Sequence, residues 1–166
     1  MFAFPMAESI HIPETVTGKK DRYEVLMPQL QSLITGETDL IANVSNIVAA
    51  LHHTFGFLWT GLYFVKGEQL VLGPFQGPVA CTRIGFGKGV CGKAWESKQT
   101  IVVPDVELFP GHIACSSLSR SEIVVPVMQD DKVVMVLDVD SERLAAFDET
   151  DALYLGRVSA MIATLI

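Results

Sequence analysis

The sequence predicts a single α+β domain, in which helices pack against an antiparallel sheet. Apolar residues recur at helical spacing near both ends of the chain, and two pairs of apolar strand-like runs lie between them. The chain has 166 residues, of which 49% are hydrophobic and 19% charged, so it can bury one core without disulfides or a structural metal. Helices that flank hairpins in this order favour a sheet with helices on one face and long loops on the other.

Residues 1–18 are expected to form an extended or weakly ordered arm, and residues 19–166 the domain. The arm contains Pro5, Pro13 and Gly18 and has no periodic pattern. Its start lacks the basic and apolar regions of a signal peptide, and no run is long enough to span a membrane. A cytoplasmic protein without membrane contact is therefore expected.

Two helices should follow the arm as a hairpin. The first covers the apolar positions from Tyr23 to Ile34, and Pro28 is expected to kink it or to begin its second piece. Thr38 is the predicted N-cap of the second helix. Its predicted buried stripe consists of Ile41, Val44, Ile47, Val48 and Leu51.

The strands are predicted from apolar runs bounded by turn residues. Residues 58–65 and 69–72 form one hairpin, residues 101–103 a short strand, and residues 122–128 and 132–140 a second hairpin. Pro126 cannot donate to a ladder and requires an edge or a bulge. A short helix is expected at residues 93–97, and a last helix after an N-cap in the acidic segment that begins at Asp148.

The charge and the glycine pattern argue against nucleic-acid binding and against nucleotide binding. The formal net charge is −7 and Lys and Arg form no cluster, which argues against a nucleic-acid partner. The glycines at positions 85, 87 and 89 fit neither a phosphate loop nor a dinucleotide fingerprint.

Cys115 is the strongest candidate for chemistry. It lies in a Pro- and Gly-containing loop, residues 109–117, between two apolar runs, where solvent and a substrate could reach its thiol. Cys81 and Cys91 flank a glycine-rich stretch, so three sulfurs could meet at one site. In a reducing compartment they could be free thiols, metal ligands or a transient catalytic disulfide. The alternative is that Cys115 is an unreactive buried thiol.

A reactive Cys115 would need help to ionise, because a free thiol is mostly protonated near neutral pH. Ionisation of the thiol could be favoured by His112, by a helix N-terminus, or by hydrogen-bond donors of the serine-rich loop that carries Cys115. The three cysteines and His112 could in principle bind zinc. However, successive cysteines are 10 and 24 positions apart, and none of them form the C-x-x-C knuckle that is typical of zinc sites. No metal is expected.

Acidic and aromatic residues could complete a site. Asp138 and Asp140 are two apart on a predicted strand and share one face, and Glu122 could join them. Such acids could hold an ammonium group or donate a proton to substrate, or they could simply be solvated strand ends. Trp59 and Tyr63 also share a face, which could cradle a thioether or methyl group or belong to the core.

Five motifs lie at residues 73–81, 87–92, 103–106, 109–115 and 121–126. Together they resemble the free methionine-(R)-sulfoxide reductases, which are GAF-domain enzymes. The resemblance covers the chain from about residue 20 onward. It implies a GAF fold with a central antiparallel sheet of about six strands and reduction of free rather than protein-bound methionine sulfoxide.

The resemblance also implies roles for the three cysteines. Cys115 would attack the sulfoxide sulfur, release methionine and become a sulfenic acid. Cys81 would then form a disulfide with it, which thioredoxin reduces. Cys91 would be either a substrate-lining sulfur or an alternative resolving thiol.

For the remaining site residues, the resemblance implies contacts with the substrate. Glu122, Asp138 and Asp140 would hold the ammonium group and help to protonate the sulfoxide oxygen, and Trp59 and Tyr63 would be pocket walls. The resemblance implies no bound cofactor. It implies thioredoxin as the external reductant and a role in the response to oxidative stress. Whether the protein forms a homodimer is left open. The alternative function is a GAF module that binds a small molecule or senses redox state without turnover.

Overall fold

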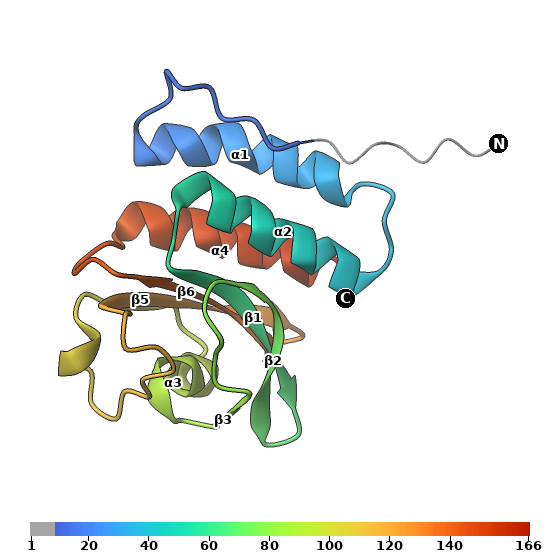
Figure 1. Cartoon of the computed structure of the whole chain (residues 1–166). Helices are drawn as coiled ribbons and strands as arrows, with labels where there is room; N and C mark the ends of the chain where they lie inside the picture. The colour runs from blue at the N-terminus through green and yellow to red at the C-terminus, as the bar shows by residue number, and fades with distance from the viewer. Residues whose placement is uncertain (1–8) are drawn as a thin grey trace.

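The computed structural model describes residues 9–166 as four α-helices and one six-stranded antiparallel sheet (Figure 1). The strands lie in the order β3-β2-β1-β6-β5-β4, and all neighbours are antiparallel. The predicted α+β class and strand number are confirmed. The elements are α1 (Lys19–Ile34), α2 (Leu40–Phe55), β1 (Trp59–Lys66), β2 (Gln69–Gln76), β3 (Arg83–Gly85), α3 (Gly89–Ser97), β4 (Ile101–Val103), the 3-10 helix η1 (Val106–Leu108), β5 (Ser121–Gln129), β6 (Lys132–Ser141) and α4 (Glu149–Ala163).

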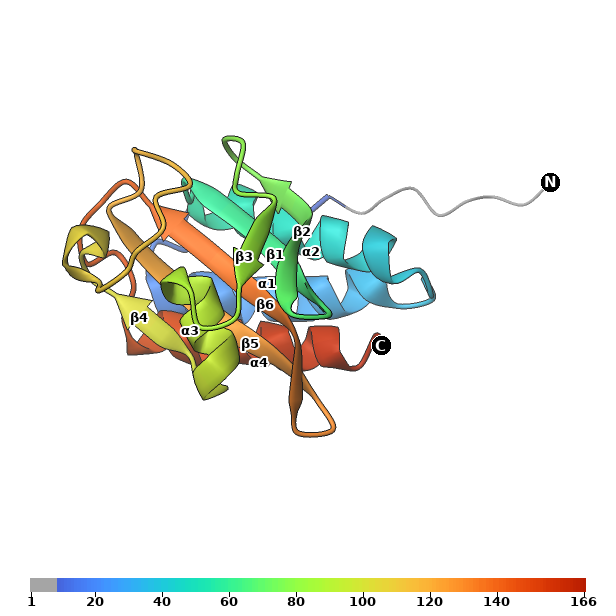
Figure 2. The ribbon, with the colours of Figure 1, turned by 90° about the horizontal axis from the view of Figure 1, so that it is seen from below.

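The sheet separates two cores. Helices α2 and α4 cover one face, with α1 packed on their outer side, while α3 and the long loops cover the other face (Figures 1 and 2). Strand residues alternate between the faces: Leu62 belongs to the helix-side core and its neighbour Tyr63 to the loop-side core. The candidate residues for chemistry lie on the loop side.

The N-cap prediction for α2 is wrong by one residue. Asp39 is the cap, since its side chain accepts a hydrogen bond from the Ala42 N–H at 2.8 Å. The Glu37 carboxylate accepts from the backbone N–H groups of both Thr38 and Asp39. The predicted buried stripe is confirmed at Val44, Ile47, Val48 and Leu51 and is wrong only at Ile41, which is 51% exposed. Leu40 packs against the helix-side core instead.

The arm is ordered where the structure describes it. From Ser9 onward it lies against α1: Ile10 and Ile12 pack on the helix-side core, and the Gln29 side chain bonds both the N–H and the C=O of His11. The earlier part of the predicted arm, including Pro5, lies outside the described residues. Helix α1 runs through Pro28 without division into two pieces.

Helix α3 begins four residues earlier than predicted, at Gly89. Gly87 and Gly89 have positive φ angles of 69° and 59°, which lets the chain turn sharply into the helix. Cys91 is therefore a helix residue, buried against the sheet, and not part of a loop.

The requirement of Pro126 for an edge or a bulge is met. Strand β4 pairs with β5 only as far as Val124, so β5 has no partner on that side at Pro126. A register irregularity between β5 and β6 follows at Val127 and Met128. None of the helices in residues 9–166 is long and apolar enough to cross a membrane.

Candidate active site

A pocket on the loop side of the sheet brings the predicted site residues together. Its floor comes from β1, β5 and β6, and its walls come from α3 and the loops that follow β2 and η1. Seven of the eight predicted residues line it, and the eighth, Cys81, is bonded to one of them. The seven are Trp59, Tyr63, Cys91, Cys115, Glu122, Asp138 and Asp140.

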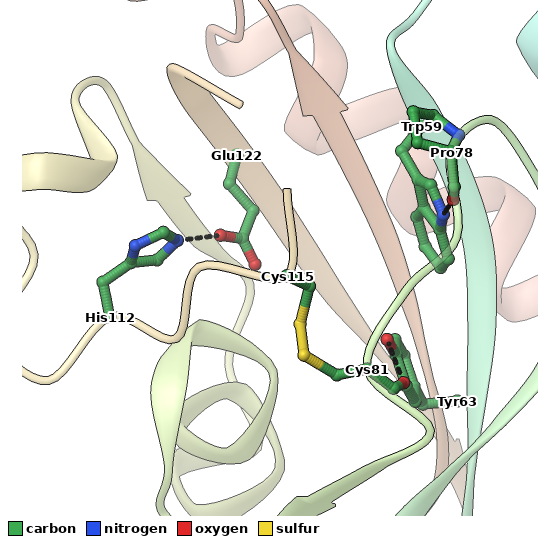
Figure 3. Close-up of a disulfide and its surroundings, with 7 residues drawn as sticks. All are labelled: Trp59, Tyr63, Pro78, Cys81, His112, Cys115 and Glu122. Carbon is green, nitrogen blue, oxygen red and sulfur yellow. Dashed lines mark hydrogen bonds and ion pairs between the residues drawn. A yellow bond between two sulfur atoms is a disulfide. The ribbon is translucent and has the colours of Figure 1, made fainter. Parts of the chain in front are cut away.

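Cys81 and Cys115 form a disulfide at this pocket (Figure 3). Their Cα atoms are 5.3 Å apart although 34 positions separate them in the sequence. Cys81 comes from the loop between β2 and β3, and Cys115 from the loop between η1 and β5. The bond joins these two loops, and both cysteines are half-buried. The pairing implied by the resemblance is therefore present in the structure.

Trp59 and Tyr63 do more than line the wall, because each holds the loop that carries Cys81 (Figure 3). The Trp59 indole N–H donates to the carbonyl oxygen of Pro78 at 3.1 Å, and the Tyr63 hydroxyl donates to that of Cys81 at 2.9 Å. Gly61 makes room for this arrangement, since a Cβ there would lie 2.3 Å from the Trp59 ring. The sequence predicted the aromatic face but not the two hydrogen bonds.

The three acids meet through strand register. Asp138 and Asp140 share one face of β6, and Glu122 of β5 is the cross-strand partner of Asp140. Glu122 and Asp138 are only 6% and 7% exposed, so they are not solvated strand ends. Three carboxyl groups therefore lie within one largely buried pocket.

Burial and mutual repulsion change the ionisation of these acids. Burial, followed by the charges of neighbouring acids, raises the pKa of both Glu122 and Asp138 well above the usual range. Burial raises the pKa of Asp140 to about 6, although the Ser119 hydroxyl, which donates to Asp140 Oδ1 at 2.5 Å, opposes the shift. The carboxyl groups of the pocket therefore keep their protons to higher pH than exposed carboxyl groups do.

One oxygen of this cluster has no hydrogen-bond partner among residues 9–166. Asp138 Oδ1 is buried and accepts no hydrogen bond from any of residues 9–166. An unsatisfied buried acceptor is costly, and a ligand with an N–H donor would relieve that cost. The site is thus chemically suited to an ammonium group.

Cys91 is the free thiol of the pocket. It is 3% exposed, and its burial, followed by the neighbouring carboxyl groups of Asp138 and Glu122, raises its pKa well above that of an ordinary thiol. Its sulfur and the nearest oxygens of Glu122 and Asp138 lie within 4.8 Å of one another, a spacing a metal ion could use. The zinc set considered from sequence is not assembled, since Cys81 and Cys115 bind each other.

His112 and Ser119 complete the surroundings of the acids. His112 Nε2 lies 3.7 Å from Glu122 Oε2, so the structure places His112 beside an acid, and its predicted action on Cys115 stays a prediction (Figure 3). Sequence reasoning missed Ser119. No motif marks it, because only the folding of residues 109–120 over the sheet brings its hydroxyl to Asp140.

Comparison with known proteins agrees with this architecture. A GAF domain model matches residues 35–166. The chain belongs to the GAF domain family. This GAF domain is 52% identical to GAF domain-containing protein A of Dictyostelium discoideum, over 95% of this chain and 99% of that protein.

Free methionine-R-sulfoxide reductases are among the similar members of the family. This GAF domain is 39% identical to that enzyme of Saccharomyces cerevisiae, over 87% of this chain and 86% of the relative. The crystal structure of the Neisseria meningitidis enzyme in complex with its substrate is 51% identical, with a TM-score of 0.93 over 96% of this chain and 95% of that chain. The resemblance seen in the sequence is thereby confirmed.

Proposed function

We propose that this protein reduces free methionine-R-sulfoxide to methionine. The observation that carries the proposal is the meeting of a disulfide-bonded cysteine pair and three crowded carboxyl groups at one pocket. The similarity to reductases over almost the whole chain supports it. We place the enzyme in the cytoplasm, where a sulfenic acid or disulfide can be reduced again.

In the first step, the Cys115 thiolate attacks the sulfoxide sulfur while an acid of the cluster gives a proton to the sulfoxide oxygen. The raised pKa values of Glu122 and Asp138 keep such protons available near neutral pH. The ammonium group of the substrate lies against the unsatisfied Asp138 oxygen, and its methyl and thioether groups lie against Trp59 and Tyr63. Methionine leaves, and the oxygen remains on Cys115 as a sulfenic acid.

In the second step, the Cys81 thiol displaces that oxygen as water and forms the disulfide. Together the two steps convert one sulfoxide and two thiols into methionine, one disulfide and water. A dithiol of the thioredoxin class then returns the pair to thiols. Cys91 lines the substrate pocket and, by its burial, stays protonated through the cycle.

Turnover with separated epimers of methionine sulfoxide tests the reaction. With dithiothreitol as reductant, the R epimer of the free amino acid should be consumed, whereas the S epimer and a peptide-bound sulfoxide should not. Cys115→Ser should lower the rate more than about a thousandfold, as loss of a nucleophile does. Consumption at the unmodified rate by Cys115→Ser would end the proposal.

Cys81→Ser separates the two steps. This variant should still release about one methionine per chain, because the Cys115 thiol is intact. It should then recycle poorly with thioredoxin, since no disulfide can form. Quantifying methionine after rapid mixing checks this, and many turnovers at the normal rate would remove Cys81 from its role.

The second candidate is a GAF module that binds a ligand or senses redox state. The same pocket and disulfide would serve such a switch, but binding would occur without chemical conversion of the ligand. Mass spectrometry distinguishes the two functions. In an enzyme, the Cys81–Cys115 disulfide appears in step with methionine release, and in a sensor no methionine is released.

A further inference from the structure

The two loops joined by the disulfide carry almost no charge. The chain contains 12 Lys and Arg and 19 Asp and Glu residues, yet none of them lies between positions 69 and 82 or between 108 and 119. These two stretches contain Cys81 and Cys115. The cores of protein–protein interfaces are depleted in charged residues in the same way.

Apolar side chains in the same loops face solvent. Val79, two residues before Cys81, is 87% exposed, and Leu118, three residues after Cys115, is 53% exposed. Ile113, two residues before Cys115, is 39% exposed. We call Val79, Ile113 and Leu118 the apolar rim. Single exposed apolar residues are common on proteins, but these three lie on the two loops that the disulfide joins, where they offer apolar contact area to a second protein.

We propose that the apolar rim is the docking surface for the protein dithiol that reduces the Cys81–Cys115 disulfide. This inference rests on the proposed function, in which that disulfide forms once per turnover. Both cysteines are half-buried. A protein reductant must therefore bind to the surrounding loops before its thiolate can reach one of the two sulfur atoms. The rim lies on both loops that carry these sulfurs, so it can orient such a partner.

Reduction of the Cys81–Cys115 disulfide by a protein dithiol balances in electrons and protons. One thiolate of the partner attacks one sulfur of the pair, which breaks the Cys81–Cys115 bond and forms a mixed disulfide between the two proteins. The second thiol of the partner attacks its own half of that bond. The partner leaves as a disulfide, and Cys81 and Cys115 each regain a thiol, so two electrons and two protons have been transferred.

Substitutions on the rim test the docking surface. Val79→Gln, Leu118→Gln and the double variant remove apolar contacts without changing the net charge. With thioredoxin, its reductase and NADPH, kcat/KM for thioredoxin should fall about threefold in each single variant and about tenfold in the double variant. Turnover driven by dithiothreitol should stay within about twofold of the unmodified protein, because a small thiol needs no docking surface.

Leu153→Gln is the matched control. Leu153 is also 53% exposed, but it lies on α4, on the other face of the sheet (Figure 1). Its replacement should leave kcat/KM for thioredoxin unchanged.

The outcomes separate this inference from the proposed function. Absence of any turnover with dithiothreitol in the unmodified protein refutes the proposed function itself. Normal turnover with dithiothreitol, combined with thioredoxin kinetics that the rim variants leave unchanged, refutes the docking surface alone. Equal losses with both reductants also overturn it, because the rim would then serve the pocket and not the partner.

Discussion

Three acids in one pocket give the site its character. Asp140 is the acid that ionises first, because the Ser119 hydroxyl stabilises its charged form. Glu122 and Asp138, which are more deeply buried, remain protonated over a wider range of pH. The pocket therefore contains a negative charge, on Asp140, that favours an ammonium group at the nearby Asp138 oxygen, together with protons for the oxygen that leaves the sulfoxide sulfur.

The raised pKa of Asp140 should reduce stability at neutral pH. Its pKa is about 6 in the folded protein and near 3.8 when exposed, so the folded state binds more protons between these values. The free energy of unfolding consequently falls as pH rises from about 4 to 6. Asp140→Asn removes the charge and should raise the free energy of unfolding by about 3 kcal/mol at pH 7.

Urea unfolding at pH 4 and at pH 7 checks this difference. At pH 4 the variant and the unmodified protein should have nearly equal midpoints, because the acid is then mostly protonated in the folded state and about half protonated in the unfolded state. A stabilisation of the same size at both values of pH would mean that the charge is not responsible.

The sequence predicted the acids better than their surroundings. Alternation along a strand places Asp138 and Asp140 on one face whatever the rest of the fold. The approach of Glu122 depends on the register of β5 against β6, and the contact of Ser119 depends on a loop path. Neither register nor loop path follows from local pattern, so the acids were found as a group while Ser119 was missed.

The loop between β2 and β3 is positioned by strand β1. Trp59 and Tyr63 donate hydrogen bonds to its Pro78 and Cys81 carbonyl oxygens, and Trp59 stacks on Tyr63 and Phe75 at centroid distances of 5.9 and 5.4 Å. A rigid strand thus fixes the approach of a cysteine that is carried by a loop. The position of that cysteine decides how quickly it reaches a sulfenic acid.

Loss of the Tyr63 hydroxyl should slow the second chemical step. Tyr63→Phe keeps the ring but removes a hydrogen bond worth about 1 kcal/mol, so disulfide formation should slow about fivefold. Sulfenic acid trapping with dimedone at timed intervals measures this step. Disulfide formation at the unmodified rate, with no additional trapped sulfenic acid, would contradict a positioning role for the hydroxyl.

Local signals predicted the elements well and their ends less well. Both hairpins, β4 and α4 lie where apolar runs and turn residues indicated. The start of α3 was predicted too late because glycines usually end helices, and here Gly89 and Gly92 are helical. Thr38 and Asp39 are both good caps by type, and only the hydrogen bond from Ala42 decides between them.

As a whole, the molecule divides structural and chemical tasks between the faces of one sheet. On the helix side, Lys19 and Tyr23 of α1 bind Asp151 of α4, which joins the first and last helices of the chain. On the loop side, the link between distant segments is the disulfide, a bond that the proposed reaction makes and breaks. Stability of the loop side should therefore depend on redox state.

The oxidised protein should be the more stable form. Closing a loop across 34 positions reduces the entropy of the unfolded chain and is expected to add roughly 3 to 4 kcal/mol to the free energy of unfolding. Urea unfolding with and without dithiothreitol measures the difference, and Cys81→Ser should show none. Equal midpoints for the oxidised and reduced protein would contradict the prediction.

In the proposed reaction, the disulfide also changes the covalent topology of the chain in every cycle. Oxidation turns an open polymer into one with a ring that encloses β3, α3, β4 and η1, and reduction opens the ring again. When reducing equivalents run short, the enzyme comes to rest in the ringed form, which resists unfolding and therefore proteolysis. The oxidised, inactive enzyme would thus persist while reductant is scarce, and it would become active again once reductant returns.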